Sequence, residues 1–277
     1  MTKTAETAFA KVNLALHIRR REPDGYHAIE TLFAFAEDGD VLQIDDAPGL
    51  RITGRFGAGL PAGADNLVMR AADAFASLTG HKRDAGFTLD KRLPVAAGIG
   101  GGSADAAAAL RLLCARHDID PAEPRISALA ASLGADIPAC LLSRSVRGEG
   151  RGDRLASLSD IPSGQPLLLI NPLLPLATGR VFAAWDGLDR GPLGRGNSLE
   201  AARAGRNDLE APAIAIMPII GTLLDLLRAQ EGSVLVRMSG SGATCFALFV
   251  DDRARDQAAR TIGLAQPGWW QLATRLR

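Results

Sequence analysis

The stretch Pro94-Val-Ala-Ala-Gly-Ile-Gly-Gly-Gly-Ser-Ala-Asp105 decides the fold that the sequence predicts. Its glycines remove side chains where a backbone must come close to a ligand. These glycines are Gly98, Gly100, Gly101 and Gly102. A helix is predicted over residues 103–116, because its interior is Ala and Leu, and Ser103 and Asp105 suit its start. The free N–H groups of a helix start bind anions, so the segment predicts a phosphate site.

The spacing of these glycines excludes two common nucleotide motifs. A Walker A loop requires a lysine directly after the glycines, and none follows here. The dinucleotide fingerprint requires a glycine where this chain has Ser103, and Pro94 prevents a strand from running straight into the loop. A nicotinamide-dependent oxidoreductase is therefore disfavoured. A loop that only caps its helix is the alternative.

A second glycine loop, Ser239-Gly-Ser-Gly-Ala243, lies between two predicted strands. Taken alone, Gly240, Ser241 and Gly242 are typical of a hairpin turn. Together with the first loop they predict two glycine clamps that close on one phosphorylated ligand.

Composition narrows the class of protein. The chain has 277 residues, and its 31 basic and 31 acidic residues cancel, which argues against nucleic-acid binding and polybasic membrane anchoring. Its 3 cysteines form no C-x-x-C pair, and no leader or membrane-spanning segment is visible, so a cytoplasmic protein is expected. Lysine is scarce. It occurs only at Lys3, Lys11, Lys82 and Lys91. Coding bias is the alternative explanation, but each of these lysines is a candidate for a role that arginine does not fill.

Hydrophobic patterning predicts an α+β fold, since strands come first and helices later without regular alternation. Predicted strands cover residues 9–18, 28–35, 41–44, 50–54, 87–91, 167–171, 234–238 and 244–250. Predicted helices cover 66–78, 103–116, 124–133, 179–185, 208–213, 218–228 and 253–262. A Gly-, Arg- and Ser-rich stretch at 143–164 suggests two domains, 1–160 and 161–277.

Lys11 and Asp136 are the candidate catalytic residues. On the first strand, Lys11, Asn13 and His17 alternate with apolar residues and are expected on one face. A carboxylate that accepts a hydroxyl proton beside an ammonium suits phosphoryl transfer to an alcohol. The alternatives are an edge-strand lysine with its ammonium in water and a capping or turn aspartate.

Tyr26 and His27 are candidates for binding a nucleotide base. An aromatic ring can stack on a base while a neighbouring histidine bonds to its edge. Ordinary packing of Tyr26 with a solvent-facing His27 is the alternative. No histidine has partners at metal-ligand spacing, so no transition-metal site is expected.

Three segments together resemble the GHMP small-molecule kinases: the strand that carries Lys11, residues 94–109 and the glycine turn Met238–Phe246. Five segments carry a closer resemblance to one branch of that superfamily. They are Phe9-Ala-Lys-Val-Asn-Leu-Ala-Leu-His17, Asp24-Gly-Tyr-His-Ala-Ile-Glu-Thr-Leu32, residues 98–109, Leu133-Gly-Ala-Asp-Ile-Pro138 and Asn207-Asp-Leu-Glu210. Within that superfamily the resemblance is to the branch that phosphorylates the 2-hydroxyl of a cytidine-diphosphate-linked methylerythritol, in non-mevalonate isoprenoid synthesis. It implies a two-domain GHMP kinase fold in which ATP and substrate meet in the cleft.

The resemblance also implies roles for individual residues. Asp136 matches the base and Lys11 its partner. The ATP-binding positions would be Asn66, Leu67, Pro94, Gly98, Gly100, Gly101, Gly102 and Ser103. The substrate-binding positions would be Asn13, Tyr26, His27, Thr178, Phe182, Gly240, Ser241 and Gly242, with Tyr26 and Phe182 enclosing the cytosine and His27 at its edge.

One departure from the family pattern concerns the metal. Many GHMP kinases have two hydroxyl residues where this chain has Ser103-Ala104, and Ala104 cannot hold magnesium. No protein ligand is assigned, and Mg²⁺ is expected to ride on the ATP phosphates. Another GHMP kinase and a non-catalytic nucleotide-binding protein are the rival functions. No nucleic-acid or membrane partner is expected, and the chain is expected to be a monomer or weak homodimer.

Overall fold

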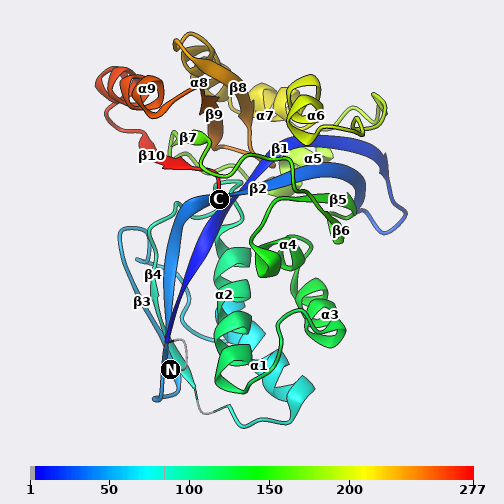
Figure 1. Cartoon of the computed structure of the whole chain (residues 1–277), viewed down its shortest axis with the longest axis vertical. Helices are drawn as coiled ribbons and strands as arrows, with labels where there is room; N and C mark the ends of the chain where they lie inside the picture. The colour runs from blue at the N-terminus through cyan, green and yellow to red at the C-terminus, as the bar shows by residue number, and fades with distance from the viewer. Residues whose placement is uncertain (1–3, 84) are drawn as a thin grey trace. The chain divides into compact units, whose positions relative to one another are not determined.

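The computed structural model describes residues 4–83 and 85–277, so Lys3 lies outside the described residues. The described chain forms two compact units, each built from separate stretches (Figure 1). Unit 1 takes the described residues up to Ala10 and those within Asp38–Val95 and Gly100–Ser143. Unit 2 takes Lys11–Glu37, Ala96–Ile99 and Arg144–Arg277. These two units are not the predicted domains 1–160 and 161–277. The division of the chain into those two domains stays a prediction.

Two long strands contribute to both units. Strand β1 is Ala5–Arg21 and β2 is His27–Asp45, and the two strands pair with each other. Lys11, Asn13 and His17, which are expected on one face of this strand, are buried as fully as their apolar neighbours. The strand predicted at 41–44 is not separate. It is the end of β2, which continues without a break through Gly39.

Unit 1 surrounds the helix that follows the first glycine loop. Strand β4 (Gly86–Asp90) pairs antiparallel with the end of β2 and parallel with β3 (Gly49–Thr53). The helices are α1 (Leu67–Thr79), α2 (Gly101–Arg116), α3 (Pro124–Leu133) and α4 (Ile137–Leu142). Asn66 caps α1 by accepting the Val68 N–H at 2.9 Å. The α2 interior of Ala and Leu is buried and packs against α1 and α4.

Unit 2 contains a four-stranded antiparallel sheet in the order β10-β7-β9-β8. Its strands are β7 (Pro166–Asn171), β8 (Ser233–Met238), β9 (Cys245–Phe249) and β10 (Trp270–Arg275). Helices α8 (Ile219–Arg228) and α9 (Asp252–Ala265) pack on this sheet through a shared apolar core. Strands β5 (Val146–Gly150) and β6 (Arg154–Ser157) extend from the first half of β2. Three short helices complete it: α5 (Thr178–Ala183), α6 (Ser198–Ala204) and α7 (Glu210–Ile216).

The start of α2 corrects the sequence prediction. The helix begins at Gly101 rather than Ser103, so two of the loop glycines form its first turn. Gly100 is the N-cap residue and has φ +65°, a left-handed conformation that glycine adopts without strain. No side chain caps this helix start, so Ser103 is not the cap.

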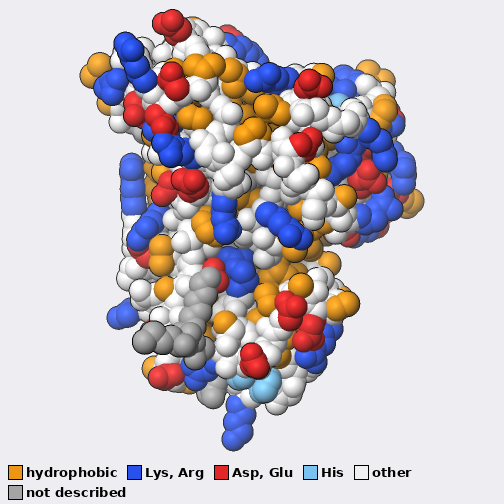
Figure 2. Space-filling model, in the orientation of Figure 1, with side chains coloured by type: hydrophobic (Ala, Val, Ile, Leu, Met, Phe, Trp, Pro, Cys, Tyr) orange, Lys and Arg blue, Asp and Glu red, His pale blue; other side chains and the backbone are white. Residues whose placement is uncertain are grey.

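Charges of both signs share the surface. Figure 2 shows acidic and basic side chains interspersed over the visible face, in keeping with the net charge of zero. Among the described residues, no helix is both long enough and apolar enough to span a bilayer.

Candidate functional site

The two predicted glycine loops touch each other within unit 2. Ser239 Oγ donates to the Gly98 carbonyl at 3.0 Å, and the Thr244 N–H donates to the Ala97 carbonyl at 3.1 Å. Gly98 has φ +78°, and a Cβ added there would lie 2.6 Å from both the Gly242 and the Ser239 carbonyl oxygens. Only a residue without a side chain fits at position 98, so the backbones of the two loops come into direct contact there.

A buried polar chain runs along β1 beside this contact. Lys11 Nζ donates to Asn13 Oδ1 at 2.7 Å, and Asn13 Nδ2 donates to Thr31 Oγ1 at 2.8 Å. The Asn13 N–H also donates to Ser239 Oγ at 3.2 Å, which ties the strand to the second glycine loop. Lys11 is 3% exposed, so the alternative of an ammonium in water is wrong. Sequence reasoning missed Thr31, although the quoted Asp24–Leu32 motif contains it.

The start of α2 lies in unit 1. Its first turn offers backbone N–H groups, and the helix dipole adds a positive field there. Leu67, the first residue of α1, lies close by, since its Cδ1 is 3.5 Å from where a Gly102 Cβ would stand. The Asn66 side chain both caps α1 and donates to the Pro61 carbonyl at 2.8 Å. The start of α1 and the start of α2 therefore lie next to each other in unit 1.

Asp136 precedes α4 in unit 1 and is half-buried. Its backbone carbonyl accepts the Cys140 N–H at 3.0 Å, but its side chain does not cap the helix. Its side chain therefore does not act as a cap, while its place in the turn before α4 is the one that the turn alternative gives.

Aromatic side chains gather around His27 in unit 2. The ring centroids of His27 and Phe182 are 5.0 Å apart, and Trp185 meets the His27 ring edge-on at 5.6 Å. Burial, and secondarily Arg21, lowers the pKa of His27, which favours the neutral imidazole. Sequence reasoning missed Trp185, whose position just beyond α5 was the only available signal.

Two other predicted substrate-binding residues, Thr178 and Tyr26, each contact a neighbouring side chain. Thr178 Oγ1 and Ser241 Oγ are 2.9 Å apart, which joins the start of α5 to the second glycine loop. Tyr26 is 55% exposed, and the Arg151 guanidinium lies 4.1 Å from its ring centroid. Arg151 also pairs with Asp24, so one face of Tyr26 is covered by a fixed cation.

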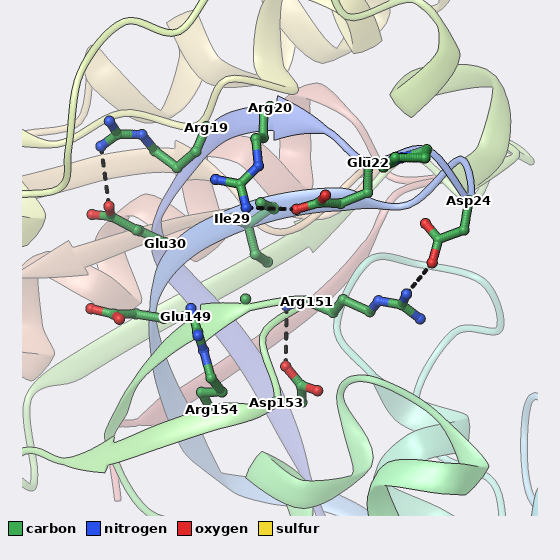
Figure 3. A pocket seen from close by; sticks show the side chains of 13 residues that line it. Arg19, Arg20, Glu22, Asp24, Ile29, Glu30, Glu149, Arg151, Asp153 and Arg154 are labelled. Carbon is green, nitrogen blue, oxygen red and sulfur yellow. Dashed lines mark hydrogen bonds and ion pairs between the residues drawn. The ribbon is translucent and has the colours of Figure 1, made fainter.

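A charged cavity of about 610 Å³ lies beside the turn that carries Tyr26 (Figure 3). Side chains of β1, β2 and the β5–β6 turn line it, and they largely neutralise each other. Arg19 pairs with Glu30 at 3.1 Å, and Arg20 pairs with Glu22 at 2.9 Å. The sequence did not predict this cavity, because the arginines that line it follow no pattern that sets them apart from the many other arginines of the chain.

Comparisons with known proteins give the family of the chain. The GHMP kinases N terminal domain matches residues 66–144, and the GHMP kinases C terminal domain matches residues 188–265. A Rhizorhabdus wittichii protein named 4-diphosphocytidyl-2-C-methyl-D-erythritol kinase is 58% identical, over 98% of this chain and 94% of that protein. The chain belongs to the 4-diphosphocytidyl-2-C-methyl-D-erythritol kinase family of GHMP kinases.

Further relatives of this kinase family support the same assignment. A Novosphingobium aromaticivorans protein of the same name is 50% identical, over 98% of this chain and 92% of that protein. A crystal structure of 4-(cytidine 5'-diphospho)-2C-methyl-D-erythritol kinase is 37% identical, with a TM-score of 0.82 and 98% of each chain covered. An L. major mevalonate kinase in complex with R-mevalonate, 12% identical with a TM-score of 0.64, shares the fold alone.

Three sequence-based expectations are thereby confirmed for this family member. The family resemblance is correct, the fold is the α+β fold of the GHMP kinases, and the chain is a small-molecule kinase. The oxidoreductase and non-catalytic alternatives are wrong.

Proposed function

We propose that the chain transfers the γ-phosphoryl group of ATP to the 2-hydroxyl of 4-diphosphocytidyl-2-C-methyl-D-erythritol, in isoprenoid precursor synthesis. The name shared by relatives of 58% and 50% identity supports this substrate. The observation that carries the proposal is the buried Lys11 ammonium, held by Asn13 next to the contact between the two glycine loops.

The chemistry divides between two residues. Asp136 accepts the proton of the acceptor hydroxyl, either fully or by orienting it. Lys11 offsets negative charge on the transferring group, and Asn13 and Thr31 fix where its ammonium stands. Burial strengthens this effect, because a hydrogen-bonded ammonium away from water interacts more strongly than a hydrated one.

Other residues bind the two substrates. Asn66, Leu67, Pro94, Gly98 and the α2 start (Gly100, Gly101, Gly102 and Ser103) take ATP through backbone groups. Tyr26 and Phe182 enclose the cytosine, with His27 at its edge. The turn of Gly240, Ser241 and Gly242 and the Thr178 hydroxyl hold the remainder of the substrate.

The magnesium ion of the reaction travels with the ATP phosphates in this proposal. Ala104 offers no oxygen, and the Asp105 carboxylate is buried and bound to Lys91, so neither side chain fits as a ligand. We propose a cytoplasmic enzyme that acts as a monomer or weak homodimer, with the family's two domains at 1–160 and 161–277.

A coupled ADP-release assay on a panel of alcohols tests the substrate. We expect turnover with 4-diphosphocytidyl-2-C-methyl-D-erythritol and none with mevalonate phosphates or homoserine. The opposite pattern would replace this function with that of another GHMP kinase.

The role of Asp136 is tested by Asp136→Asn, which should lower kcat by roughly 10²–10⁴-fold with ATP affinity little changed. Asp120→Asn is the matched control, since Asp120 is a turn aspartate of the same unit that accepts the Ala122 N–H at 2.8 Å. The control should keep wild-type kcat. Near-normal kcat in Asp136→Asn would remove Asp136 from its role.

A further inference from the structure

Lys91 is the second buried lysine of a chain that otherwise prefers arginine. It directly follows β4 in unit 1 and is 3% exposed. Its Nζ lies 2.6 Å from Asp40 Oδ2 and 2.5 Å from Asp105 Oδ2. Asp40 and Asp105 are buried too, so two carboxyl groups share one ammonium away from water.

This cluster connects the two ends of the first glycine loop. The other oxygen of Asp40 accepts the N–H of Arg92 at 2.6 Å and that of Leu93 at 2.8 Å, directly before the loop. Asp105 lies in the second turn of α2, directly after the loop. The Lys91 ammonium therefore links the backbone that leads into the loop with the helix that leads out of it.

The first residue of α2 stands over the ammonium. A Cβ added at Gly101 would lie 3.1 Å from Lys91 Nζ and 3.7 Å from Asp40 Oδ2. A compact ammonium fits under this turn, whereas a planar guanidinium needs more room and more acceptors. This explains why the position holds one of the chain's few lysines.

The cluster is electrostatically constrained. Burial raises the pKa of Asp105 to about 8, although the Lys91 charge opposes that shift. Asp105 Oδ1 is buried without a hydrogen-bond partner, so Lys91 is the main contact that holds the carboxyl in place. Removing the ammonium would leave two carboxyl groups facing each other in the core, where a buried charge without a partner is unfavourable.

We propose that Lys91 is a positioning residue for ATP, which fixes the anion-binding start of α2 against the backbone entering the glycine loop. The inference rests on the proposed function, since it takes ATP as the ligand of that loop. Lys91 does not need to touch ATP. It acts by holding the backbone N–H groups where the phosphates meet them, and displacement of such groups by about 1 Å weakens a site by up to about 100-fold.

The test compares Lys91→Met with Arg111→Met. Arg111 is the matched control, because it holds α2 through a largely buried ion pair, with Glu6 at 3.2 Å, but farther along the helix from the loop. The measurements are KM for ATP, KM for the alcohol substrate, and calorimetric binding of a non-hydrolysable ATP analogue. We expect Lys91→Met to raise the KM for ATP roughly 10- to 100-fold and to weaken analogue binding equally. The KM for the alcohol should stay within about threefold, and Arg111→Met should keep the wild-type KM for ATP.

Two results would overturn the inference: an unchanged KM for ATP in Lys91→Met, or the same rise in both variants, which would indicate general loosening. If Lys91→Met does not fold, the double variant Lys91→Met/Asp105→Leu replaces it. Apolar replacement of a buried ion pair preserves folding in known cases, so this variant should fold and still show the raised KM for ATP. Wild-type ATP binding in the folded double variant would refute the positioning role. A wild-type protein that binds no ATP analogue would overturn the proposed function as well, which separates the two failures.

Discussion

Gly98→Ala tests the contact between the two glycine loops. The added Cβ would stand 2.6 Å from two backbone carbonyl oxygens and 2.9 Å from the Gly242 nitrogen. None of these atoms is the end of a flexible side chain, so the loops themselves must separate. The residue would also hold a side chain at φ +78°, in the left-handed region.

The expected loss of stability has two parts. A side chain in the left-handed conformation costs roughly 1–2 kcal/mol. Overpacking against fixed neighbours adds about 1–3 kcal/mol. The free energy of unfolding should therefore fall by about 2–5 kcal/mol, which at this chain length corresponds to a Tm lower by about 4–20 °C.

Gly164→Ala is the matched control for backbone strain alone. Gly164 belongs to the same unit and has φ +81°, but an added Cβ would meet no atom within 4 Å. Its substitution should lower stability by only about 1–2 kcal/mol. Urea unfolding of both variants gives the difference, and ATP-analogue binding should weaken only in Gly98→Ala. Equal losses of stability in the two variants would refute the argument that the loops are in obligatory contact.

Two further predictions concern buried polar groups. Thr31→Val should lower the free energy of unfolding by about 1–3 kcal/mol, because it leaves the Asn13 amide without its acceptor. The kcat should also fall, because Lys11 loses its fixed position, and an unchanged kcat would contradict the orienting role of Thr31. Asp105→Asn should remove a pH dependence: the folded protein keeps the Asp105 proton up to about pH 8, whereas the unfolded chain loses it near 3.8, so wild-type stability should fall as pH rises from about 4 to 8. Urea midpoints at pH 5 and pH 8 check this, and an equal change in both proteins would refute it.

Much of the fold could be predicted from local signals in the sequence. The helix of residues 66–78 was found because Asn66 is a strong capping residue before an apolar repeat, and it does cap α1. The buried strand at 167–171 was found from its continuous apolar run. The strand pair around the second glycine loop was found from its turn residues, and β8 and β9 do pair across that loop.

The errors have physical reasons. The alternative of a solvated Lys11 was wrong because both faces of β1 are covered there, so its polar residues are buried. The start of α2 was placed at Ser103 because propensity disfavours glycine in helices, whereas Gly101 is required where the helix stands over Lys91. Five short elements were missed, since their order depends on tertiary partners: α4, β5, β6, α6 and β10.

The candidate site was recognised through motifs, and its supporting residues were not. Thr31 and Lys91 act by holding other residues in place. The residue type at one position does not show which residue, far along the chain, its side chain contacts. Lys91 meets Asp40 across 51 positions of sequence, which no local pattern records. The scarcity of lysine was the one signal that pointed to it.

The hydrogen bond between Asn13 and Ser239 joins residues 226 positions apart, and this separation has a consequence for synthesis in the cell. At translation rates of about 5–20 residues per second, about 11–45 s pass between the synthesis of Asn13 and that of Ser239. During that interval the apolar side chains of Leu14 and Ile18 lack the C-terminal sheet and helices that complete their unit. The nascent chain therefore exposes the apolar β1 segment early in synthesis. The yield of folded protein should depend on chaperones that shield this segment until the last strands emerge.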